Sequence, residues 1–204
     1  MKRFLLLLVF LSQLVFADDS YLIDDSLAMA RQGEFVRASN LIVDLANNGD
    51  SSAQYVLSMY FRDPNALNIP EVGEMWLMRA AENNNAKAQY DLGWRLAAGW
   101  KNDTVEDIVE MIYWFERATF NGSDDAYANL ATLYENEHRN VLLEMEVAAN
   151  NGNAMAQFNL GWINARGLVS SEGLMQDMDV AKAWFEKSAN LGFKDAIEVL
   201  EKNF

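Results

Sequence analysis

The chain has 204 residues, enough for a domain with a substantial core, and its hydrophobic content of 51% excludes an intrinsically disordered protein. The 30 Asp and Glu residues against 16 Lys and Arg give a net charge of −14, which argues against direct binding to nucleic acid or to an anionic membrane surface. A basic protein partner stays open, although acidic side chains also simply keep a helical surface soluble. The absence of cysteine excludes disulfides and thiolate chemistry.

A signal peptide is predicted at the N-terminus. Lys2 and Arg3 precede an apolar run that begins at Phe4, and the small residue Ala17 ends the run in a pattern suited to cleavage. The run is about 14 residues long, shorter than the ~20 that cross a bilayer, which favours cleavage over a membrane anchor. We therefore expect residues 1–17 to be removed and the mature protein to be exported to the periplasm or secreted, with no stable membrane insertion afterwards.

Residues 81–94 and 149–162 are near copies of each other, with the sequences AENNNAKAQYDLGW and ANNGNAMAQFNLGW. Weaker copies begin at Ala46 and Ala118. Turn-forming residues mark the successive units at intervals of 30 to 40 residues, namely Gly49, Asn84, Gly122, Gly152 and Gly192. Intervals of this length are typical of helix–turn–helix solenoids.

The repeats and their apolar periodicity predict two helices in each unit, followed by a C-terminal capping helix. The predicted helices lie near residues 20–32, 34–47, 51–62, 72–83, 86–98, 106–121, 124–137, 139–150, 154–165, 178–190 and 194–203.

A small residue follows the repeat leucine in each copy, at Ser58, Gly93, Ala131 and Gly161. We expect it to let the second helix of the unit approach closely. The bulky Trp76, Trp114 and Trp184 of the second helices are expected to fill the space between neighbouring units. Each turn residue is expected to take the left-handed conformation that caps a helix.

The third unit departs from this pattern, because Glu144 stands where the tryptophan is expected. We expect Leu142, Leu143 and Met145 to take over the packing there.

These residues resemble the Sel1-like repeat family, a branch of the tetratricopeptide-like helical repeats. The fourth full unit carries most of the family pattern, at Ala154, Ala156, Leu160, Gly161, Gly167, Asp177, Ala181, Trp184, Phe185, Lys187, Ala189 and Gly192. The resemblance implies one all-α domain over residues 18–204, a right-handed α-α superhelical solenoid of about five helix–turn–helix repeats. It also implies work as a protein-binding adaptor or scaffold rather than as an enzyme.

Two tryptophans are less easily assigned to repeat packing. Trp94 and Trp162 each follow the small glycine of a first helix, and an Asp or Asn lies three residues earlier on roughly the same face. Exposed tryptophans are good interface anchors, so this stripe is a candidate lining for a concave partner-binding groove, with packing between repeats as the alternative. The candidate groove residues are Asp91, Trp94, Arg95, Asn129, Asn159 and Trp162.

The sequence offers no constellation for catalysis. His138 is the only histidine, so neither a metal pair nor a Ser–His–Asp arrangement is indicated, and we expect no metal and no cofactor. The acidic pairs at residues 24–25 and 124–125, and Asp177, are expected at helix starts, where negative charge meets the helix dipole.

The signal peptide and the repeats together favour a periplasmic adaptor that regulates or assembles an envelope component. An immunity protein that neutralises a secreted toxin is the alternative, because the acidic charge suits occlusion of a basic active site. A cell-wall hydrolase is a remote third reading.

Overall fold

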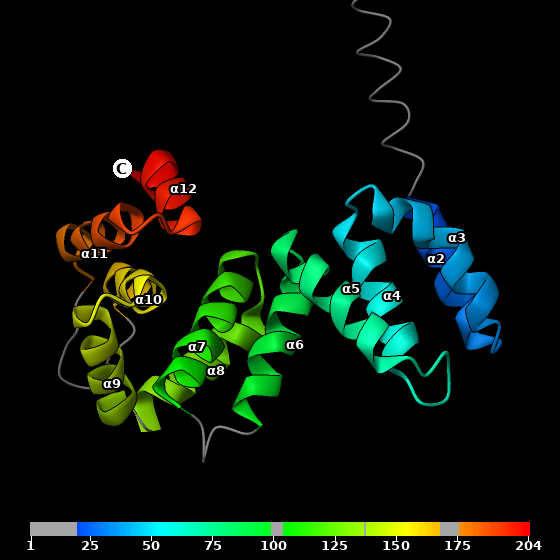
Figure 1. Cartoon of the computed structure of the whole chain (residues 1–204), viewed down its shortest axis with the longest axis horizontal. Coiled ribbons are helices and arrows are strands. Elements are labelled where there is room, and N and C mark those ends of the chain that lie inside the picture. The colour runs from blue at the N-terminus through cyan, green and yellow to red at the C-terminus, as the bar shows by residue number, and fades with distance from the viewer. Residues whose placement is uncertain (1–19, 99–103, 137, 168–175) are drawn as a thin grey trace, which may run out of the picture. The chain divides into compact units, whose positions relative to one another are not determined.

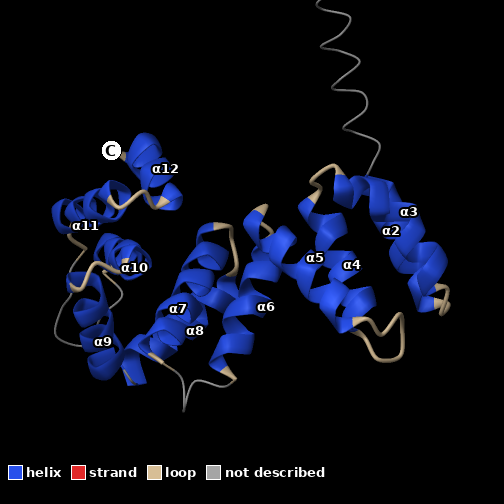
Figure 2. Cartoon of the chain, viewed as in Figure 1, coloured by secondary structure: helices blue, strands red, loops and turns tan. Residues whose placement is uncertain are grey.

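The structure, a computed structural model, describes residues 20–98, 104–136, 138–167 and 176–204. The predicted signal peptide at residues 1–17 lies outside the described residues. Every regular element in the described ranges is an α-helix (Figure 2). The predicted all-α fold class is therefore confirmed. The helices are α2 (Ser20–Arg31), α3 (Phe35–Asn47), α4 (Ser51–Arg62), α5 (Pro70–Glu82), α6 (Ala86–Ala97), α7 (Val105–Phe120), α8 (Asp124–Asn136), α9 (His138–Asn150), α10 (Ala154–Arg166), α11 (Met178–Asn190) and α12 (Lys194–Asn203).

Successive helices pack in pairs, as the predicted helix–turn–helix repeats require (Figure 1). The described helices form two compact units, one that ends at Asn85 and one from Ala86 to Phe204. The first unit contains the pairs α2–α3 and α4–α5. The second contains α6–α7, α8–α9 and α10–α11, and α12 covers α11 at the end of the chain.

The α8–α9 pair in the second unit differs from the others. α8 packs mainly on α7 and α9 packs mainly on α10, while the two touch each other little. As a result, α10 also packs directly on α7. Met145 of α9 is fully buried and Leu142 is partly buried, as predicted for the residues that replace the tryptophan, but Leu143 is exposed.

Each unit has its own apolar core. Ala38, Ile42 and Leu57 are fully buried in the first unit, and Ile112, Leu130, Met145 and Ile163 are fully buried in the second. Burying one such large side chain stabilises a fold by about 1.5–3 kcal/mol. These cores hold the helix pairs together, and the outer faces of the helices are not needed for core packing.

At Gly93 and Gly161, the small residue after the repeat leucine permits close approach of the second helix, as predicted. A Cβ added at Gly93 would lie 2.7 Å from Cδ1 of Phe115, and one added at Gly161 would lie 2.6 Å from Cδ1 of Phe185. The ring that occupies this space belongs to the residue after the repeat tryptophan, which the prediction did not identify. Of the tryptophans themselves, Trp114 is buried, whereas Trp184 is only half-buried.

The turn residues that mark the repeats all have positive φ, as expected for left-handed helix caps. The values are 97° at Gly49, 65° at Asn84, 93° at Gly122, 88° at Gly152 and 83° at Gly192. Asn84 takes this conformation at small cost, because its side chain is among those that tolerate the left-handed region.

Two of the three predicted acidic helix starts are found. Asp177 caps α11 by accepting hydrogen bonds from the backbone N–H groups of Asp179 and Val180, and Asp124 and Asp125 lie in the first turn of α8. The prediction for residues 24–25 was wrong, because α2 begins at Ser20 and places this pair in its interior.

Candidate functional site

Of the two tryptophans in the predicted groove, Trp94 is the more exposed. Ala88 and Gly93 direct one face of α6 onto α7, and Trp94, one residue further round the helix, points away from that contact. Its side chain is 55% exposed. Arg95 is exposed beside it and Asp91 is half-buried on the same helix.

Trp162 occupies the same repeat position in α10 but has a different environment. Its ring lies 5.3 Å from the ring of Phe120 and 5.4 Å from that of Phe185, and the guanidinium of Arg166 lies 4.8 Å from its centroid. These contacts make Trp162 half-buried and use its ring in packing. One motif therefore yields an exposed tryptophan in one repeat and a packed one in another.

The two asparagines of the candidate groove also serve internal contacts. Asn129 of α8 donates a hydrogen bond to the hydroxyl of Tyr90 at 3.2 Å. Asn159 is fully buried and donates to the backbone carbonyl of Val109 at 2.8 Å. The burial of Asn159 removes it from the side chains that a partner can touch, so the open part of the predicted groove is centred on Trp94.

A buried glutamine recurs at the same position in three repeats, and sequence reasoning missed it. We call Gln54, Gln89 and Gln157 the glutamine ladder; each follows the first-helix alanine of its repeat and is buried. The amide of Gln54 donates to the carbonyl of Ala46, and that of Gln157 donates to the carbonyl of Ala149, both at 2.8 Å. The recurring Ala-Gln-aromatic triplet is the signal that could have revealed it.

The amide oxygens of the ladder meet the ends of the second helices. Asn83, at the C-cap of α5, donates to Oε1 of Gln54, and Asn121, at the C-cap of α7, donates to Oε1 of Gln89, both at 2.9 Å. Leu191 stands at the corresponding C-cap of α11, and Oε1 of Gln157 is buried with no hydrogen-bond partner in the part of the chain that the structure describes. The hydrogen bond between the C-cap side chain and the glutamine is therefore missing in the last repeat.

A buried ion pair joins α7 and α10. The carboxylate of Glu116, which has no exposed surface, pairs with the guanidinium of Arg166. Burial raises the pKa of Glu116 to about 7 against the opposing effect of Arg166, because desolvation disfavours the charged form. The other carboxylate oxygen of Glu116 and the buried hydroxyl of Tyr134 have no hydrogen-bond partner among the described residues.

The capping helix α12 is tied back to α7 across 82 positions of sequence. Asp195 accepts hydrogen bonds from the hydroxyl of Tyr113 at 2.9 Å and from the guanidinium of Arg117 at 2.7 Å. Burial raises the pKa of Tyr113 to about 12, so this hydroxyl stays protonated and remains a donor over the physiological range. These contacts and the 5.7 Å approach of the Phe193 and Tyr113 rings hold the end of the chain on the second unit.

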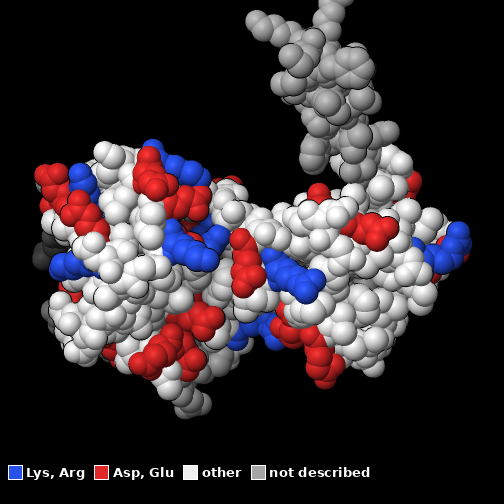
Figure 3. Space-filling view, turned by 45° about the horizontal axis from the view of Figure 1, so that its top comes forward, with Lys and Arg blue, Asp and Glu red and all other residues white. Residues whose placement is uncertain are grey.

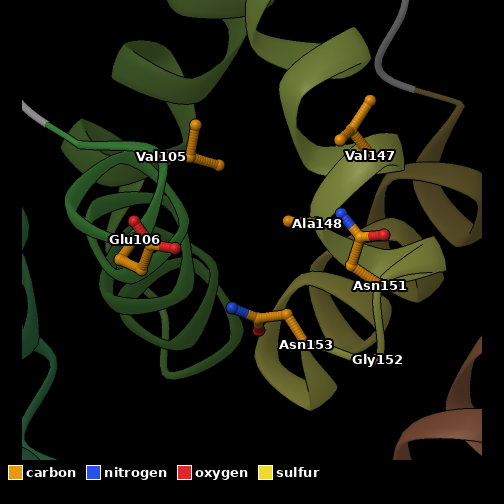
Figure 4. Close-up of a pocket in the computed structure, with 7 residues that line it drawn as sticks. All are labelled: Val105, Glu106, Val147, Ala148, Asn151, Gly152 and Asn153. Carbon is orange, nitrogen blue, oxygen red and sulfur yellow. The ribbon is translucent and has the colours of Figure 1, made fainter.

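A pocket of about 420 Å³ opens between the first turn of α7 and the end of α9 (Figure 4). Val105 and Glu106 form one wall, and Val147 and Ala148 form the other. The α9–α10 turn, residues 151–153, closes one end. The predicted site did not include it, although the departure from the repeat pattern at Glu144 marks the same helix.

Charged side chains lie in small separate groups on the face shown in Figure 3. Among the described residues, no three His, Cys, Asp or Glu side chains are arranged to hold a metal ion. None of the described helices has the length and apolar content needed to cross a membrane.

Helix pairs with left-handed turns at a regular interval and buried polar links between them define a helical-repeat protein. Residues 86–119 and 154–193 match the model of the Sel1 repeat. These two segments are Sel1 repeats, so the predicted resemblance to the Sel1 repeat family is confirmed.

Twelve chains among the solved structures are similar to this one, including the two that follow. One is a Sel1 repeat protein from Oxalobacter formigenes, 25% identical over 81% of this chain and 66% of that one, with a TM-score of 0.43. The other is a protective antigen of uropathogenic Escherichia coli strains that displays an SLR fold, 25% identical over 89% of this chain and 40% of that one, with a TM-score of 0.46. This chain thus spans less than two thirds of the length of each. None of the curated proteins matches the chain.

Proposed function

We propose that this protein is an exported adaptor that binds a partner protein in the periplasm and regulates or assembles an envelope component. Sel1 repeats typically act as scaffolds for protein interactions, which supports the binding role. The N-terminal run of apolar residues after Lys2 and Arg3 supports export.

The observation that carries the binding role is the difference between Trp94 and Trp162. A tryptophan that packs inside the repeat, as Trp162 does, stabilises the fold. Trp94 is 55% exposed, although removing a large ring from water is favourable. Tryptophan is enriched among the residues that dominate binding energy, so Trp94 is our proposed anchor for the partner.

The test is an affinity purification of the tagged protein from its native envelope, compared with the Trp94→Ala variant. The matched control is Tyr127→Ala, because Tyr127 is also an exposed aromatic residue of the second unit, 48% exposed. Circular dichroism would first show that both variants are folded. A partner retained by the Tyr127 variant and lost by the Trp94 variant supports the proposal, whereas a partner retained equally by both contradicts the role of Trp94.

Export is tested separately on the same strain. Periplasmic and cytoplasmic fractions would be separated, and the N-terminus of the purified protein would be sequenced. We expect the protein in the periplasmic fraction with Asp18 as its first residue. A cytoplasmic protein that retains Lys2 and Arg3 would contradict export without affecting the binding role.

The net charge of −14 also favours a second candidate, an immunity protein that covers the basic active site of a secreted toxin. The identity of the purified partner separates the two, because an envelope component supports the adaptor and a toxin supports the immunity protein.

A further inference from the structure

The pocket between α7 and α9 combines apolar side chains with the carboxylate of Glu106. Val105 and Val147 face each other across it, and Val147 is 53% exposed (Figure 4). Leu143 lies one helical turn before Val147 on the same face of α9 and is 58% exposed. The pocket therefore continues into an exposed apolar stripe.

Among the described residues that line the pocket, Glu106 is the only charged one. Its neighbour Asp107 is held in the capping box of α7, where its carboxylate accepts from the backbone N–H of Thr104 at 2.9 Å. Within the described part of the chain, the carboxylate of Glu106 makes no hydrogen bond or ion pair. This acceptor is therefore available to a ligand.

The far end of the pocket is polar and rigidly built. Asn153 caps α10, because its side-chain oxygen accepts from the backbone N–H of Ala156 at 2.9 Å. Gly152 turns the chain with a φ of 88°. The exposed side chain of Asn151 points from this turn toward the cavity (Figure 4). The amide at this end and the carboxylate of Glu106 on one wall give acceptors in two directions.

The electrostatic balance of the pocket favours a cation. The starts of α7 and α10 contribute a fractional positive charge, equivalent to roughly +0.5 at each helix N-terminus. The full negative charge of Glu106 projects from the first turn of α7 and offsets that contribution. The described lining residues include no lysine or arginine, so an anion entering the pocket would meet Glu106 without a compensating cation from them.

We propose that this pocket receives an arginine side chain from a basic segment of the partner protein, with a neighbouring apolar side chain of that segment on Leu143. This inference rests on the proposed binding function and names the chemistry of the partner. The aliphatic stem of arginine fits between the valines while its head remains polar. The five N–H donors of a guanidinium point in several directions, which suits acceptors on a wall and at one end of the pocket better than a single ammonium does.

The test uses two acetylated and amidated peptides, one with an arginine between two leucines and the other with citrulline in place of that arginine. Citrulline keeps the shape of arginine and removes its charge. Binding would be followed by the backbone amide NMR signals of the full chain at an ionic strength of about 0.15 M, where distant charges are screened. We expect the arginine peptide to shift the signals of Glu106, Val147 and Gly152 and to bind about tenfold more tightly than the citrulline peptide.

Two variants with the same change in net charge decide where the arginine binds. Glu106→Gln is expected to remove the difference between the peptides, and Glu201→Gln, an exposed acid on α12, is expected to preserve it. Equal binding of both peptides, equal losses in both variants, or shifts confined to other residues would overturn the proposal. A purified partner that binds the Glu106→Gln variant as well as the original protein would also overturn it and leave the adaptor function standing.

Discussion

Gly161 of α10 lies directly against the ring of Phe185 on α11. A Cβ on Gly161 would be 2.6 Å from Cδ1 and 2.8 Å from Cζ of that ring, well inside van der Waals contact. Phe185 is itself almost completely buried, so its ring has little room to move.

The first prediction is that Gly161→Ala lowers the free energy of unfolding by about 1–3 kcal/mol, because overpacking forces the two helices apart. The same change in an exposed helix would stabilise it by about 1 kcal/mol. Urea unfolding measures the difference. In a Phe185→Leu background, Gly161→Ala should lower the free energy of unfolding by less. An unchanged loss of stability in this double-mutant cycle would show that the Phe185 ring does not oppose the added methyl group.

The second prediction concerns the hydrogen bond that Gln157 lacks, at the place where Gln54 and Gln89 each accept one from an asparagine. Leu191→Asn is expected to raise the free energy of unfolding by about 0.5–1.5 kcal/mol, because the new amide can donate to the unpaired oxygen of Gln157. The backbone at Leu191, with φ −86° and ψ 3°, is close to that at Asn121, with φ −88° and ψ 14°. Leu191 is 55% exposed, so the loss of apolar burial is small.

The reciprocal variant tests the same hydrogen bond in the repeat of Gln89, where it is present. Asn121→Leu leaves the buried oxygen of Gln89 without the hydrogen bond that Asn121 donates, which is expected to cost about 1–3 kcal/mol. Thermal unfolding of the two variants should shift in opposite directions. Destabilisation by Leu191→Asn would contradict the equivalence of the two C-caps.

The third prediction is a pH dependence caused by Glu116. Its pKa is raised by burial from 4.5 to about 7, so the folded protein retains this proton where the unfolded chain releases it. The stabilisation is therefore present in full below about pH 4.5 and is lost as the pH rises through about 7. One pKa unit corresponds to about 1.4 kcal/mol, so the loss between pH 5 and 7.5 is expected to be about 1–3 kcal/mol.

The control for this dependence is Glu116→Gln, which cannot release a proton. The free energy of unfolding would be measured by urea titration at several pH values between 5 and 7.5. The original protein should lose stability across this range relative to the variant. Parallel curves for the two proteins would show that Glu116 does not change its protonation on unfolding.

The fourth prediction concerns the attachment of α12 to α7. Asp195→Asn removes the negative charge of the acceptor in the Tyr113 and Arg117 hydrogen bonds and so weakens both, which is expected to cost about 1–3 kcal/mol. Glu198→Gln, which removes the exposed pair with Lys202 on the same helix, should cost less than about 0.5 kcal/mol. Equal effects in urea unfolding would mean that α12 is not held by Asp195.

Much of the fold was predictable from sequence because its signals are local. The helix of residues 51–62 was predicted with its observed bounds, since a turn glycine and the Asp50 cap precede it. The site was less predictable because its contacts join distant residues. Trp94 and Trp162 share one motif, and the environment of Trp162 depends on residues distant in sequence, such as Phe120 from another repeat and Phe185. The pocket depends on the position of α9 relative to α7, which no local sequence pattern specifies.

The direct packing of α10 on α7 has a consequence for the way this chain can evolve. Solenoids ordinarily lengthen or shorten by duplication or deletion of a repeat, because each repeat touches only its neighbours. Here the Glu116–Arg166 ion pair and the Asn159–Val109 hydrogen bond connect positions 50 residues apart, across the intervening α8–α9 pair. An extra repeat inserted at that point would separate both contacts and strand a buried carboxylate. We therefore expect the number of repeats between α7 and α10 to stay fixed, and we expect changes in chain length to fall outside residues 105–166.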